Sequence, residues 1–251
     1  LLAEGSDNVV IGYKALDAAT TNERQNVVIG SGAGGAIVGS PSDDNVLIGH
    51  LAGTGGGGTT EDCVVIGAYA MDGTGANTQT GTVAIGYFAL SDLDDGAGNT
   101  AIGYKAMLEE QGGDNNTVLG YQAMDDSGGF DNDDNVFIGK DSGGGTWVTA
   151  ASSQNVAIGS SAMAGAMNGA TYNVAMGHQA LGGITTGDEN VAIGQSVLIT
   201  ATTSSDCVGV GSGVLAAVNH VDADGAVAVG YNALNALTSG QRNVAVGFNA
   251  G

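Results

Sequence analysis

Three short acidic clusters are the residues in this sequence best suited to binding a hard metal ion. They occupy residues 92–95, 131–135 and 222–225. The ligand candidates are Asp92, Asp94, Asp131, Asp133, Asp222 and Asp224. Carboxylate oxygens are the ligands that Ca²⁺ prefers, but none of the clusters carries the full EF-hand pattern. The sequence therefore leaves two interpretations, solvated acidic turns and weak Ca²⁺ sites, and it predicts no other cofactor.

The two cysteines offer a second kind of chemistry. Cys63 and Cys207 occupy the same slot of a repeated motif, eight motif copies apart. At the spacing of stacked β-strands this separation is roughly 40 Å, far beyond the reach of a disulfide. Two interpretations remain: small residues tolerated in one structural slot, or an interchain contact in an assembly.

Nucleophilic and zinc chemistry have no support in the sequence. His50 and His178 follow a repeated glycine, in the slot where other copies of the motif carry tyrosine. They are too few and too far apart for a zinc site. No serine, histidine and aspartate set stands out, and the glycine run 143–145 lacks the Lys-Ser/Thr of a phosphate-binding loop. We predict that the chain is not an enzyme.

Composition and charge exclude further classes of function. The chain has 46 glycines, one proline and a formal net charge of −21. Nucleic-acid binding needs a basic surface, and anionic lipids repel an acidic one. No apolar run reaches the roughly 18 residues of a membrane span. We expect neither nucleic-acid binding nor membrane insertion.

The element that must position these residues is a repeat of the form Asn-Val-(Val/Ala)-Ile-Gly-x-x-Ala-Leu. Its glycine recurs every 17 to 20 residues. The glycines are Gly12, Gly30, Gly49, Gly67, Gly86, Gly103, Gly120, Gly139, Gly159, Gly177, Gly194, Gly211, Gly230 and Gly247. A short β-branched run ending in an obligatory glycine predicts one strand per copy. We predict an all-β fold, a parallel β-solenoid or β-roll of about fourteen coils of about 18 residues each.

The strands of this repeat are apolar on both faces. Side chains alternate along a strand, so the Val and Ile columns share one face and the smaller Ala/Val column takes the other. One face can fill the coil, and the other needs a cover that oligomerisation supplies, most simply as a homotrimer. The predicted assembly core is Val9, Ile11, Gly12, Ile29, Gly30, Ile48, Gly49, Ile85, Gly86, Ile102, Gly103, Ile158, Gly159, Ile193 and Gly194.

Two columns keep more than one interpretation. The glycine column indicates either positive φ or close approach of neighbouring chain. The leading asparagines, such as Asn26 and Asn173, fit either a turn into the strand or a ladder between stacked coils. Trp147, Phe130 and Tyr172 lie in the variable segments, where they could contact a receptor or pack over a neighbouring coil.

The runs at residues 99–107 (NTAIGYKAM) and 190–194 (NVAIG) resemble two known repeats. One is the glycine-rich repeat of phage tail-fibre proteins, and the other is the head repeat of trimeric autotransporter adhesins. The resemblance spans all fourteen copies, and the Tyr-x-Ala-Leu continuation is closer to the fibre type. It implies a trimeric fibre with parallel β-coils and a role in attachment to surfaces.

These observations together predict one repeat domain over residues 1–251, part of a longer fibre protein. Leu1–Ala3 and the final Asn-Ala-Gly read as parts of incomplete repeats. The expected function is a shaft or head segment of a phage tail fibre, located on the virion, with loops available to a glycan or protein receptor on the host. The alternative is a trimeric adhesin of a bacterial surface, or an extracellular filament subunit.

Overall fold

The computed structural model describes residues 5–18, 22–35, 42–55, 58–75, 77–147, 149–219 and 221–251. Leu1–Ala3, which the repeat pattern assigned to a preceding coil, lie outside the described residues. The chain forms two compact units, residues 1–122 with 129–131 and residues 123–128 with 132–251. Both units are built from the same repeat.

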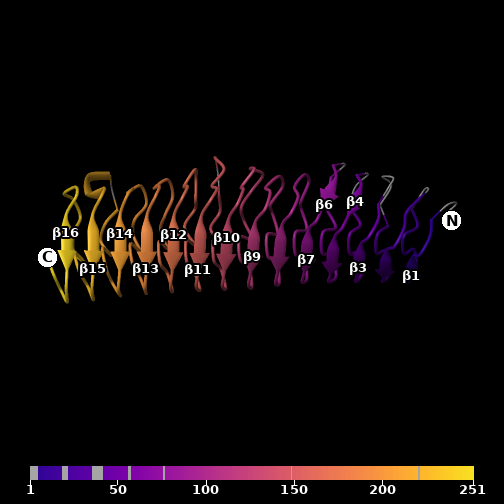
Figure 1. Ribbon diagram of the computed structural model, residues 1–251, viewed down its shortest axis with the longest axis horizontal. Helices are drawn as coiled ribbons and strands as arrows, with labels where there is room; N and C mark the ends of the chain where they lie inside the picture. Colours follow the sequence, from indigo (N-terminus) through magenta and orange to yellow (C-terminus); the bar gives the residue numbers. More distant parts are fainter. Residues whose placement is uncertain are drawn as a thin grey trace. The chain divides into compact units, whose positions relative to one another are not determined.

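Among its described residues, the first unit holds seven parallel strands that pair with one another along the chain. They are β1 (Val9–Ile11), β2 (Val27–Ile29), β3 (Val46–Ile48), β5 (Val64–Ile66), β7 (Val83–Ile85), β8 (Thr100–Ile102) and β9 (Thr117–Leu119). A second, shorter parallel pair joins β4 (Thr60–Glu61) to β6 (Gln79–Thr80). In Figure 1 the arrows of this unit point the same way, each separated from the next by one loop.

The second unit repeats this arrangement with seven more strands. They are β10 (Val136–Ile138), β11 (Val156–Ile158), β12 (Val174–Met176), β13 (Val191–Ile193), β14 (Val208–Val210), β15 (Val227–Val229) and β16 (Val244–Val246). A single turn of 3₁₀-helix, η1 (Val221–Ala223), precedes β15.

The strands pair in the register that the repeat predicts. Val pairs with Val, the central residue with the central residue, and Ile with the third residue of the next strand, as in Val156↔Val174 and Ile158↔Met176. Each of the fourteen predicted motif cores forms one three-residue strand. The predicted fold class is confirmed: the protein is an all-β, parallel β-solenoid with coils of about 18 residues.

The interior of each coil is filled by the central strand residue together with the third and fourth residues after the glycine. Ala101, Ala106 and Met107 are examples, and all three are fully buried. The coils with Leu47 and Phe137 as the central residue carry glycine in the Met107 slot. A Cβ on Gly143 would lie 2.8 Å from Phe137 Cδ1. In these two coils the central side chain takes up the space that Met107 fills in its own coil.

The repeat glycine has a positive φ and also lies close to the neighbouring coil, so both interpretations of the glycine column are correct. Gly103 has a φ of 145°, and a Cβ at this position would lie 2.1 Å from the carbonyl oxygen of Gly120 in the next coil. Only glycine allows this backbone conformation and this approach together. The spacing of successive coils therefore depends on the glycine column.

The asparagine column forms a ladder in the interior. Asn173 Nδ2 donates to Asn155 Oδ1 at 3.1 Å, and Asn173 Oδ1 accepts from the backbone N–H of Asn190 at 3.0 Å. Asn173 Nδ2 also donates to the carbonyl oxygens of Thr171 and Gly187. The ladder interpretation is confirmed, and the asparagines join successive coils as well as satisfying their own turns.

Candidate functional site

The first and third residues of the strands make up the outer apolar face, the side opposite the filled interior. The central residues are buried in all of these strands except β1 and β16, whereas their neighbours are half-buried or exposed. Met176 and Ile193 in the second unit are each 39% exposed. Sequence pattern alone predicted two apolar faces, and the structure shows that the smaller column turns inward. The predicted isoleucines of the assembly core, such as Ile102 and Ile158, all lie on this outer face.

An aromatic row follows the outer apolar face in the first unit. Tyr87, Tyr104 and Tyr121 each come directly after a repeat glycine. Their rings stack with centroid separations of 5.6 Å and 5.1 Å, and all three side chains are at least 40% exposed. In the second unit Tyr231 and Phe248 stack in the same slot at 5.3 Å.

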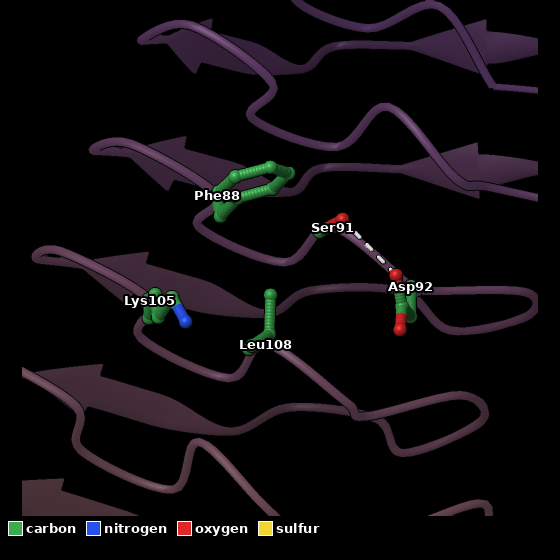
Figure 2. A pocket seen from close by; sticks show the side chains of 5 residues that line it. All are labelled: Phe88, Ser91, Asp92, Lys105 and Leu108. Atoms are coloured by element: carbon green, nitrogen blue, oxygen red, sulfur yellow. Dashed lines mark hydrogen bonds between the residues drawn. The ribbon is translucent and has the colours of Figure 1, made fainter.

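A shallow pocket lies between two successive coils beside this row. Figure 2 shows its walls: Phe88, Ser91 and Asp92 come from one coil, and Lys105 and Leu108 from the next. Its volume is about 220 Å³. The two coils are joined here by the backbone N–H of Asp92, which donates to the carbonyl oxygen of Leu108 at 3.2 Å.

The turn geometry directs Phe88 and Lys105 to the pocket. Both sit two residues after a repeat glycine with a φ of 54°, a left-handed conformation that is uncommon for residues other than glycine. Because the slot is the same in successive coils, Phe88 has Tyr69 on one side and Lys105 on the other. Tyr69 stacks on the Phe88 ring at 5.0 Å, and Tyr87 meets it edge-on at 4.5 Å.

The polar side of the pocket is organised around Ser91. The buried Ser91 Oγ lies 2.8 Å from Asp72 Oδ1 and 3.0 Å from Asp92 Oδ1. Burial raises the pKa of Asp72, an effect that the Ser91 hydrogen bond opposes and the nearby Asp92 charge reinforces. One hydroxyl has a single proton to donate, so it cannot satisfy both carboxylates at once.

The structure does not gather the six acidic candidates into a metal centre. In the part of the chain that the structure describes, no group of three or more His, Cys, Asp or Glu side chains could hold a metal ion. Asp92 lines the pocket, Asp94 O accepts from Gln79 Nε2, and Asp131 Oδ1 lies close to Gly112. Asp222 falls in η1, and its side chain lies outside the description.

Two of the acidic candidates belong to a column that links coils through the backbone. Asp224 Oδ1 accepts from the backbone N–H of Ser205 at 2.9 Å, and Asp188 Oδ1 accepts likewise from Thr171 at 2.7 Å. In the same slot, the backbone N–H of Asp133 donates to Ser153 Oγ. These acidic residues thus serve hydrogen bonds between coils.

Both cysteines are free and fully buried. Burial raises the pKa of the Cys63 thiol to about 11 and raises that of Cys207 as well. Their inward position favours the small-residue interpretation and speaks against an interchain contact. His50 Nδ1 lies 3.1 Å from the carbonyl oxygen of Ser31 and the ring meets Tyr69 edge-on, in keeping with a column residue.

The aromatic residues of the variable segments differ in burial. Trp147 is buried, its Nε1 donates to the carbonyl oxygen of Gly143 at 3.2 Å, and its ring packs against Phe137. Tyr172 is 57% exposed. Sequence reasoning did not predict the pocket, although placing the repeat columns of adjacent coils side by side would have brought Phe88 next to Lys105.

Comparison of the chain with known proteins does not assign it to a family. No family model, curated protein or solved structure matches the chain. Among the described residues there is no helix with the length and hydrophobicity needed to cross a bilayer.

Proposed function

We propose that this chain is a segment of a trimeric attachment fibre, the shaft or head of a phage tail fibre. The observation that supports this proposal is the outer apolar face. Val and Ile side chains repeat there in register, strand after strand, with no charged residue in any of the strand triplets. The rest of the acidic chain carries a net charge of −21.

An uncharged apolar strip along an otherwise acidic protein fits association with identical copies. Three copies around one axis would each bury this face, because parallel strands that are apolar on both sides are buried on both sides. The hydrogen-bonded coils would supply stiffness, and the loops would remain outside. In this proposal the protein is part of the virion and presents its loops to the host surface.

The mass of the native particle tests the trimer. Light scattering coupled to size exclusion should give three times the 24.4 kDa of the chain. The double variant Ile158→Glu, Ile193→Glu places two carboxylates on the outer apolar face and should reduce the mass to one chain while circular dichroism stays unchanged. Gln241→Glu, which adds one carboxylate at an exposed position elsewhere in the second unit, should leave the trimer intact. A monomeric native protein would overturn the proposal.

A further inference from the structure

We propose that the pocket between Phe88 and Lys105 binds the ring of one neutral sugar, as the terminal residue of a surface glycan would present it. This inference deepens the proposed attachment role and rests on it. None of the five lining residues belongs to the outer apolar face, so the pocket can be tested separately from assembly.

The aromatic wall fits the apolar face of a pyranose ring. Phe88 is held by Tyr69 on one side and Tyr87 at its edge, so its remaining face is fixed toward the pocket. The electron-rich face of an aromatic ring attracts the weakly positive C–H groups that a pyranose presents on one side. Leu108 extends this apolar surface from the next coil.

The polar groups on the rim fit hydroxyl groups. Lys105 supplies donors, and the exposed Asp92 carboxylate supplies acceptors. A sugar hydroxyl both donates and accepts, so neighbouring hydroxyls can use the two groups together. The ion pairs among the described residues involve Lys14 and Lys140, which leaves the Lys105 ammonium for a ligand, with the Tyr104 ring 5.8 Å away.

Size and charge narrow the ligand to a single neutral ring. At about 220 Å³ the pocket is smaller than the roughly 300–1,000 Å³ that larger ligands occupy. The lining carries one ammonium, that of Lys105, and one carboxylate, that of Asp92, and the Asp72 carboxylate lies behind Ser91. The net charge of −21 disfavours a strongly anionic ligand at long range.

The combination occurs at one pair of coils rather than along the whole repeat. The slot of Lys105 holds Gln122 in the next coil, and Gln179, Ser196 and Asn232 further on. Phe88 is the residue in this slot that has both a stacked aromatic neighbour before it and a lysine after it. The combination of side chains that forms the pocket is therefore specific to this pair of coils, although the backbone repeat is the same in the others.

Saturation-transfer NMR on the full chain, with methyl glycosides of glucose, galactose, mannose and N-acetylglucosamine at millimolar concentration, tests the site. At least one glycoside should receive saturation. Phe88→Leu and Lys105→Gln use residues found in this slot in other coils, so both should fold, and each should weaken binding about tenfold. Lys14→Gln, the same change in the same slot of the first coil, should leave binding unchanged.

The outcomes separate this inference from the proposed function. Absence of transfer to every glycoside, or transfer that Phe88→Leu and Lys105→Gln leave unchanged, would overturn the sugar site. Light scattering on the same sample reports the trimer independently. A trimer without glycoside binding would leave the fibre proposal standing and remove the pocket from it.

Discussion

The asparagine ladder is continuous in one stretch of the second unit and interrupted in the first. The Oδ1 atoms of Asn135, Asn155 and Asn173 each accept from the backbone N–H of the next asparagine, and Asn190 Oδ1 accepts from the backbone N–H of Cys207. In the first unit the ladder passes from Asn45 to the backbone N–H of Cys63 and stops there. Thr82 follows in the same slot, and its buried Oγ1 has no hydrogen-bond partner.

The interruption coincides with extra backbone pairing. The residues just before Cys63 and Thr82 form β4 and β6, the second parallel pair of the first unit. The backbone N–H of Gln79 donates to Thr59 O, and that of Gly81 donates to Glu61 O. Where the side-chain ladder ends, main-chain hydrogen bonds connect the same two coils. The bond from Gly81 has counterparts beside the intact ladder, such as Glu189 N–H to Thr171 O, so the addition at this corner is the bond from Gln79.

Removing a central amide from the intact ladder should give the largest effect. Asn173 is fully buried, and Asn173→Ala would leave the Asn190 N–H and the Gly187 carbonyl without their side-chain partner. We expect a loss of roughly 3 kcal/mol in unfolding free energy and faster hydrogen exchange at the Asn190 amide. Asn243→Ala, at a half-buried position of the column, is the control and should cost much less. Equal losses of unfolding free energy in the two variants would contradict a stabilising role for the buried ladder.

A smaller effect should appear at Cys63, where the ladder is interrupted, as a dependence of the unfolding free energy on pH. The folded-state pKa of Cys63 is about 11 against an ordinary 9.0, so the folded protein keeps a proton that the unfolded chain loses. The stabilisation is complete below pH 9 and is lost as pH rises to 11, by roughly 2 kcal/mol. Denaturant midpoints measured against pH should show this fall. Cys63→Ala should show less of it, and identical curves would refute the assignment to this thiol.

The smallest expected effect is a gain from completing the interrupted ladder. In the variant Cys63→Asn, Thr82→Asn, the first amide would supply an acceptor to the second, as in the continuous stretch. We expect about 1 kcal/mol of added stability in denaturant unfolding, limited because β4 and β6 already link these coils. Either single variant should gain less than the double one. A double variant no more stable than the singles would show that the two sites do not couple.

Sequence alone predicted the strands and their register, because a glycine forced by backbone geometry marks each copy. It could not assign the inward face, since the columns of Ala101 and Ile102 are both apolar. It left the role of Asn173 open, because a turn and a ladder need the same side chain. It missed the pocket, since Phe88 and Lys105 lie in different coils and become neighbours only once the coils are stacked.

The exchange of volume between strand and turn has a consequence for how such a protein changes length. A coil with Phe137 opposite Gly143 and a coil with Ala101 opposite Met107 contain similar interiors and present the same glycine and strand to their neighbours. Two such coils can therefore stack on one another through the same glycine contact. Unequal recombination between copies of the repeat in the gene should add or delete whole coils and still encode a protein that folds.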